Sequence, residues 1–182
     1  MKVLIAALAA ACVMSVASAF AGEAKIPDYG LSADLGERWT VSDNGSDQRL
    51  DTGNAAIRQL VFEDKGQKVA DVILFVTKDK QSKSMPLSEW GPKVADEMRA
   101  WYDEGSHSTG VWQDGTGVLG SGQQAQLRSA KINANGNERY IAFAYFEKGG
   151  RYYGMFIMNP AHVDKDIASA VPTILKGVAL TN

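Results

Sequence analysis

The chain has 182 residues, 22% of them charged, and a formal net charge of −2. Its acidic and basic side chains are mixed along the sequence, which argues against a nucleic-acid partner because neutralising phosphates needs clustered Lys and Arg. Cys12 is the only cysteine, so no disulfide can form within the chain, and the length suffices for one well-packed domain.

The first 21 residues have the organisation of a secretory signal peptide. A single cation at Lys2 precedes an uncharged apolar run over residues 3–16, and small residues then provide two cleavage sites, after Ala19 and after Ala21. The run is too short and too rich in alanine for a membrane span. We therefore expect residues 22–182 to form a single domain in a periplasmic or secreted location.

Cys12 leaves a second processing route open, namely lipid attachment. Lipoprotein signals carry a large aliphatic residue three positions before the modified cysteine, whereas Leu8 stands four positions before Cys12. The sequence therefore favours simple cleavage over lipidation.

The first half of the exported segment predicts short strands and one hairpin. A strand is expected over residues 31–35, followed by a turn and further extended chain through Val41. Residues 43–54 consist largely of turn formers and predict a loop. Residues 57–62 and 69–77 are rich in β-branched and aromatic side chains, and the glycine of the intervening EDKGQK suits the turn of a hairpin.

The hydrophobic period changes to that of a helix over residues 87–102. The apolar residues at helical spacing are Leu87, Trp90, Val94, Met98 and Trp101. Pro92 lies near the start of this helix, where proline is tolerated, and Gly105 should end it. The glycine-rich stretch that follows, residues 109–122, predicts a mobile surface loop.

Three further strands are predicted at residues 124–132, 138–147 and 151–158, joined by turns that contain NANGN and KGG. Such short turns require antiparallel neighbours. A final amphipathic helix should follow, and Pro172 should kink it or divide it in two. Its apolar side is formed by Val163, Ile167, Val171, Ile174 and Leu175.

The strand RYYGMFIM, residues 151–158, is apolar on both faces, so each face of the sheet needs a cover. We therefore expect an α+β fold: an antiparallel sheet of about six strands sandwiched between helices on both faces. Tyr152 and Phe156 should pack under one helix, and Met155 and Ile157 under the other. This assigns the strand to the core rather than to a ligand site.

The segment YGLSADLGERWTVSD, residues 29–43, resembles the opening of the PsbP/DcrB-like superfamily. The aromatic strand RYYGMFIM and the closing PTILKGVAL, residues 172–180, are similar to the C-terminal half of that family. The resemblance implies an antiparallel sheet of about six strands flanked by helices. Members include an extrinsic photosystem subunit, a eukaryotic nuclear-transport cofactor and bacterial envelope proteins, with no shared catalytic residues, so it implies no particular activity.

Two motifs suggest a bound cofactor, and each lacks part of the required context. GTGVLG, Gly115 to Gly120, matches G-x-G-x-x-G, but a dinucleotide site needs a helix immediately after it, and strand is expected there. DNGSD, Asp43 to Asp47, offers oxygen ligands for calcium but lacks the closing glutamate of an EF-hand loop. We expect no cofactor.

The histidine and serine residues give little indication of a metal site or a catalytic nucleophile. His107 and His162 show no metal-ligand spacing. Ser121 misses the G-x-S-x-G nucleophile elbow because Leu119 stands where the first glycine is needed. A spatial triad of His107 with a neighbouring serine and a carboxylate stays open.

The aromatic residues around the glycine-rich stretch are the remaining candidates for a functional surface. Tyr102, Trp112 and His107 form the predicted partner or ligand surface. We expect a non-catalytic exported protein that binds an envelope protein or complex. The alternatives are a small-ligand-binding protein with a pocket between helix and sheet, and, third, a hydrolase whose site the sequence does not reveal.

Overall fold

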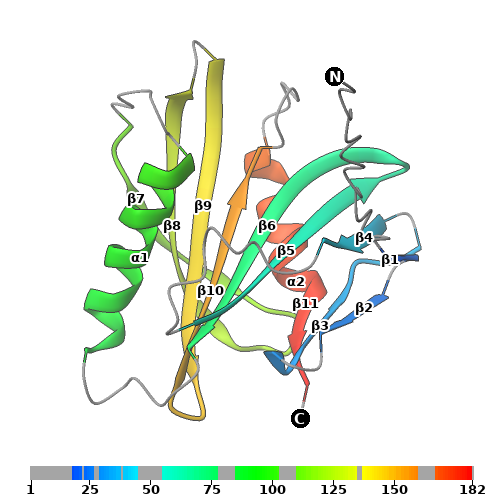
Figure 1. Cartoon of the computed structure of the whole chain (residues 1–182), viewed down its shortest axis with the longest axis horizontal. Helices are drawn as coiled ribbons and strands as arrows, with labels where there is room; N and C mark the ends of the chain where they lie inside the picture. Colours follow the sequence, from blue (N-terminus) through cyan, green and yellow to red (C-terminus); the bar gives the residue numbers. More distant parts are fainter. Residues whose placement is uncertain are drawn as a thin grey trace, which may run out of the picture.

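A computed structural model describes residues 18–21, 23–26, 29–37, 39–44, 55–77, 85–102, 110–134, 137–159 and 167–181. A long antiparallel sheet forms the centre of this part of the chain, and a smaller sheet lies beside it (Figure 1). In spatial order the large sheet contains β1 (Ser18–Ala21), β4 (Trp39–Asp43), β5 (Ala55–Asp64), β6 (Gln67–Thr77), β10 (Arg151–Met158), β9 (Asn137–Lys148), β8 (Gln124–Ala134) and β7 (Gln113–Val118).

The small sheet and the helices complete the described fold. The small sheet is ordered β11 (Val178–Leu180), β3 (Leu31–Asp34) and β2 (Glu23–Ile26), and the helices are α1 (Leu87–Tyr102), the 3-10 turn η4 (Ile167–Ser169) and α2 (Val171–Gly177). None of the helices within the described residues is long and apolar enough to cross a membrane.

The predicted hairpin is confirmed as β5 and β6, and its turn is tighter than expected. Lys65 and Gly66 have φ angles of 53° and 73°. Two consecutive residues in this left-handed region are typical of the two-residue turn whose twist matches that of the flanking strands. The strands therefore extend to Asp64 and resume at Gln67.

One face of the large sheet packs against α1, which spans the predicted residues. Ala95 and Met98 of α1 are buried in a cluster that includes Phe143 of β9 and Phe156 of β10. Gly91 lets the helix approach the sheet closely, because a Cβ atom there would overlap the ring of Tyr145. The apolar side of α1 thus rests on the odd-numbered residues of β9 and the even-numbered residues of β10.

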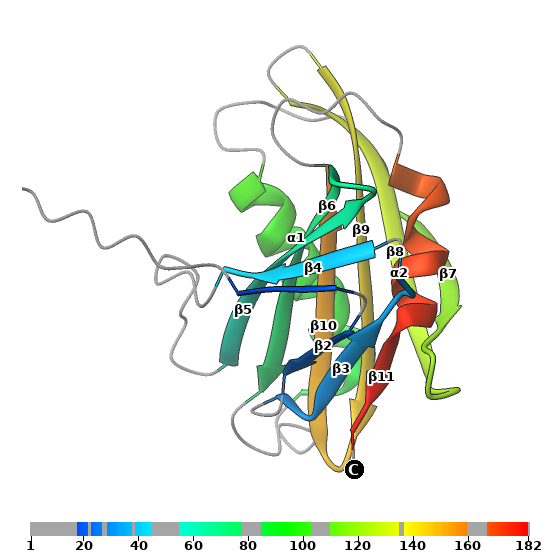
Figure 2. The ribbon, with the colours of Figure 1, turned by 90° about the vertical axis from the view of Figure 1, so that its right-hand side faces the viewer.

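The opposite face carries a mixed cover. Ile174 and Leu175 of α2, Val178 of β11 and residues of β3 share a second cluster with Met155 and Ile157 of β10. Figure 2 shows α1 on one side of β9 and β10, with α2 and the small sheet on the other. Every residue from Tyr152 to Met158 is buried, which confirms that β10 is a core strand.

The expected sandwich needs correction in two respects. The large sheet has eight strands within the described residues rather than about six, and one of the eight, β1, lies in the segment assigned to the signal peptide. Its second face is covered by the small sheet, η4 and α2 together rather than by a helix alone. Pro172 lies in the first turn of α2, where it suits a helix start, so it separates α2 from η4. A helix of seven residues is too short to cover that face.

The glycine-rich stretch is also corrected, because residues 113–118 form β7 and pair with β8 in continuous register. Its glycines allow close packing. A Cβ atom at Gly117 would lie 2.6 Å from the Leu175 side chain, and one at Gly120 would overlap the carbonyl oxygen of Lys176. Gly117 and Gly120 thus serve contact with α2 rather than mobility.

Candidate functional site

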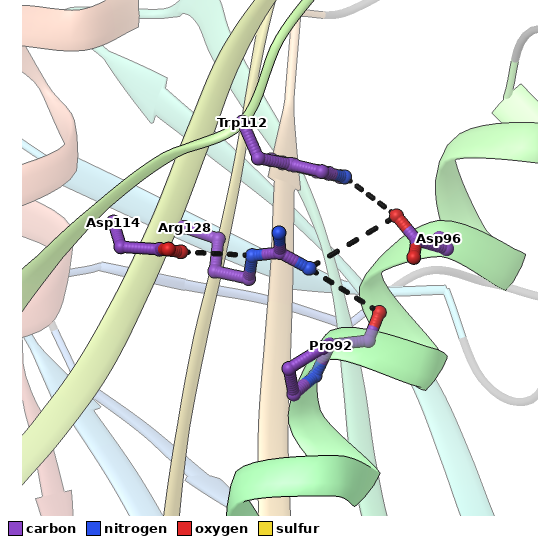
Figure 3. Close-up of polar contacts among 5 residues, drawn as sticks. All are labelled: Pro92, Asp96, Trp112, Asp114 and Arg128. Carbon is purple, nitrogen blue, oxygen red and sulfur yellow. Dashed lines mark hydrogen bonds and ion pairs between the residues drawn. The ribbon is translucent and has the colours of Figure 1, made fainter.

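Trp112 lies one residue before β7 and is held against α1. Its indole N–H donates a 2.7 Å hydrogen bond to Asp96 Oδ1, in the middle of the helix (Figure 3). The ring is half-buried and packs on the cluster beneath α1. Trp112 is therefore an anchor for the start of β7 rather than an aromatic ring offered to solvent.

Arg128 of β8 connects the same elements. Its Nε donates a 2.9 Å hydrogen bond to Asp114 Oδ1 of β7, and its Nη1 reaches the carbonyl oxygen of Pro92 at 3.5 Å and Asp96 Oδ1 at 4.0 Å. The guanidinium carbon also lies 5.2 Å from the centre of the Trp112 ring, within range of a cation–π interaction. Pro92, Asp96, Trp112, Asp114 and Arg128 are called the Arg128 cluster below (Figure 3).

The Arg128 cluster contains charges and hydrogen bonds suited to holding strands in place. Only 16% of the Arg128 side chain is exposed, and its charge is shared between two acceptors on different elements. A planar guanidinium with several donors is well suited to such bridging. None of its five members is a nucleophile activated by a base, so its chemistry is that of a brace.

Tyr102 lies at the C-terminal end of α1 in a separate cluster. Its hydroxyl donates a 3.0 Å hydrogen bond to the backbone oxygen of Asn159, and its ring meets Phe156 edge-on at 6.3 Å. Burial raises the pKa of Tyr102, the nearby Arg139 lowers it, and Asp71 raises it again. The structure therefore anchors Tyr102 to β10 and does not bring it together with Trp112.

Two buried charged residues accompany Tyr102 between α1 and the sheet. Arg139 of β9 and Asp71 of β6 are both buried. The Asp71 side chain is 10% exposed, and its Oδ1 makes no hydrogen bond within the described residues, although the Lys68 ammonium lies 3.1 Å away in an ion pair. Buried charges need such partners, so this end of α1 is the most polar part of the interior described.

The remaining candidate residues and motifs do not form a metal or cofactor site within the described residues. His107 lies outside the described residues, as do His162, Cys12 and Asp47. Asp43 binds Arg58 through both carboxylate oxygens, each 2.9 Å from Nε. Among the described residues, no group of three or more His, Cys, Asp or Glu side chains could hold a metal ion. The G-x-G-x-x-G stretch lies in β7 and the turn after it, and β8 follows.

The edge strand β7 is a surface that the sequence did not reveal. Among the described residues, the exposed large apolar side chains are Val111, 81% exposed, and Val118, 43% exposed. They lie just before β7 and at its last position. The alternation of Gly115 and Gly117 is the signal that could have indicated a strand with one face free of side chains.

Comparison with known proteins concerns the fold. No protein-family model matches the chain, and no curated protein matches it in sequence. The solution structure of cyanobacterial PsbP (CyanoP) from Synechocystis sp. PCC 6803 matches over 92% of this chain and 95% of that chain, with a TM-score of 0.55 and 11% sequence identity. The chain has a PsbP-like fold. The PsbP-like fold agrees with the resemblance found in residues 29–43 and 151–180, and at this identity it carries no function with it.

Proposed function

We propose that this is a non-catalytic exported protein that acts by binding another protein or complex of the cell envelope. The binding surface is the outer side of β7 with Val111 and Val118. The observation that carries this proposal is their exposure, 81% and 43%, at either end of one strand. The two valines are seven positions apart in the chain and flank β7, so a partner that contacts both would lie along this strand.

The bracing of β7 supports the same proposal. Trp112 and Asp114 are bonded to Asp96 and Arg128, so the strand is held in place before any partner arrives. A surface that is already ordered loses less conformational entropy on binding. In this proposal the Arg128 cluster positions the binding surface, and the partner contacts the valines and the edge of β7.

Export is the part of the proposal that intact mass can test. The mature protein should begin at Phe20 or Gly22, because Ala19 and Ala21 offer the signal peptidase its two good sites. The mass of the protein recovered from the envelope of its own cells should match one of these starts. A mass that corresponds to an acylated Cys12 at the N-terminus would make the protein a lipoprotein instead.

The binding surface can be tested with a double variant, Val111→Ser with Val118→Ser. Both side chains are exposed, so the free energy of unfolding should change by no more than about 0.5 kcal/mol per site. The variant should no longer co-migrate with its envelope partner on native gels. Ala100→Ser, at an exposed position of α1, is the matched control and should co-migrate like the unmodified protein. Unchanged co-migration of the double variant would exclude this surface.

A second candidate function, small-ligand binding between helix and sheet, is favoured by the buried Asp71. The Oδ1 atom of Asp71 forms an ion pair with the Lys68 ammonium at 3.1 Å, so a ligand that carries an ammonium or hydroxyl group would bind there by replacing Lys68. Native mass spectrometry of the protein from its own envelope would reveal such a ligand. The ligand should be lost in Asp71→Asn, and a spectrum without any bound molecule would remove this candidate.

A further inference from the structure

We infer that β7 binds its partner by strand addition: an extended, uncharged segment of an envelope protein pairs antiparallel with the open edge of β7. The segment places a large apolar side chain beside Gly115. This inference rests on the proposed function, and it specifies how the same site recognises its partner.

The outer edge of β7 is open within the described residues. β7 is the last strand of the large sheet and pairs with β8 alone, through six consecutive residue pairs without a register shift. Alternate residues of an edge strand direct their N–H and C=O groups away from the neighbouring strand. The backbone hydrogen bonds made by Leu119 and Gly120 begin only after β7 ends.

The usual protection of an edge strand is missing from β7. Edge strands commonly carry lysine, proline, a bulge or an unpaired charge, each of which discourages pairing with another chain. The sequence QDGTGV has no lysine or proline, its register is regular, and its one charge, Asp114, is bonded to Arg128.

The side chains near the edge indicate what the added strand carries. Gly115 pairs with Leu127 of β8, and a Cβ atom at Gly115 would meet nothing within 4 Å. Large side chains on a neighbouring strand pack well beside such an edge glycine. Gly117 is different, because Leu175 already occupies the space above it. The open space therefore lies at Gly115, between the edge and the half-buried Leu127.

The charges on β7 favour an added strand without charged side chains. The Asp114 carboxylate is neutralised by Arg128 at 2.9 Å, and β7 has no other ionisable side chain. A charged residue in the added strand would lose hydration here without gaining a free partner on β7. Antiparallel pairing continues the arrangement of every strand pair in this sheet.

The test compares two substitutions at the exposed Thr116. Thr116→Lys puts a charge of the kind that protects natural edges onto β7, whereas Thr116→Val keeps β-branching and size. Ala100→Lys on α1 controls for the added charge. A photoreactive phenylalanine analogue at Val118, in the protein as its own cells export it, serves as the cross-linking probe. Unfolding midpoints of all variants are measured alongside.

We expect a cross-link from position 118 to a different envelope protein. Its yield should fall at least about tenfold in Thr116→Lys and stay within about twofold in Thr116→Val and Ala100→Lys. Amide hydrogen exchange of the purified complex should show new protection of β7 relative to the free protein, because strand addition bonds its outward N–H groups.

Three results would overturn strand addition. A cross-link to a second copy of this chain would make the edge a self-association surface. A yield unaffected by Thr116→Lys, or a complex without new protection of β7, would mean that Val111 and Val118 bind a partner by side-chain contact, and the proposed function would then stand without strand addition. If the protein forms no envelope complex at all, both proposals are wrong.

Discussion

The indole N–H of Trp112 and the carboxylate of Asp96 lie 2.7 Å apart and join the start of β7 to the middle of α1. Sixteen positions separate the two residues in the chain, and Arg128 lies near both. A segment that the glycine content predicted to be mobile is therefore tied to the helix that covers the sheet. This connection has a direct consequence for stability.

Trp112→Ala should lower the free energy of unfolding by about 2–4 kcal/mol, because it removes a large ring from the cluster beneath α1 together with the bond to Asp96. Trp112→Phe retains most of the packing and loses the indole donor, so it should lower stability by about 0.5–1.5 kcal/mol. Urea denaturation of both variants measures these differences. A change below about 1 kcal/mol for Trp112→Ala would contradict the anchoring role.

The burial of β10 on both faces predicts that two neighbouring substitutions are both severe. Phe156→Ala should lower the free energy of unfolding by about 3–5 kcal/mol and Ile157→Ala by about 2–5 kcal/mol, since each loses transfer energy and leaves a cavity in a different cluster. Val118→Ala, at an exposed position, is the control and should change stability by less than about 0.5 kcal/mol. An unmoved denaturation midpoint for either core variant would place one face of β10 in water.

Gly91→Ala should destabilise the protein even though alanine favours helix. The added methyl group would overlap the Tyr145 ring, which is stacked on Phe143 at 5.6 Å and has little room to move. We expect a loss of about 1–3 kcal/mol from overpacking, against a helix-propensity gain of about 1 kcal/mol. Thermal denaturation measures the net change.

A double-mutant cycle separates this contact from a general effect of the substitution. In a Tyr145→Ala background the ring is absent, so Gly91→Ala should become neutral or stabilising. The same loss in both backgrounds would show that Gly91 is needed for a reason other than its contact with Tyr145.

Tyr102 predicts a dependence of stability on alkaline pH. Burial is the main cause that raises its folded pKa above the ordinary value of 10.0, with Asp71 adding to the increase and Arg139 opposing it. A raised pKa means that the contribution of Tyr102 to stability is complete below about pH 10 and is lost as pH rises from there through the folded pKa. Tyr102→Phe should therefore show a shallower decline in the free energy of unfolding between about pH 9.5 and 11. Urea denaturation at each pH measures these free energies. If they declined in parallel for the unmodified protein and Tyr102→Phe, the raised pKa of Tyr102 would be contradicted.

The pattern of apolar residues in the sequence was sufficient to predict α1 and most strands of the large sheet. The ends of α1 were predicted correctly because apolar side chains recur at helical spacing from Leu87 to Trp101. The strands β5, β6, β8, β9 and β10 were predicted because β-branched and aromatic runs lie between short turns. The burial of β10 on both faces could also be derived, since its side chains are apolar at odd and even positions alike.

The candidate site was predicted less well, for a physical reason. Tyr102 and Trp112 could be named from the sequence, but whether an aromatic ring is offered or anchored depends on partners far along the chain, here Asn159 and Asp96. Nothing in the local sequence of Trp112 indicates that Arg128 of another strand will lie beside its ring.

The sequence by itself determined the elements whose apolar residues repeat with a clear period, because burial of those side chains stabilises the element wherever it packs. Only the tertiary structure decided the state of residues 113–118. Glycine carries no side chain to bury and has no strong preference of its own, so QDGTGV becomes a strand through its hydrogen bonds to β8 and the brace at Arg128. The same holds for β11, which is only three residues long and is defined by its pairing with β3.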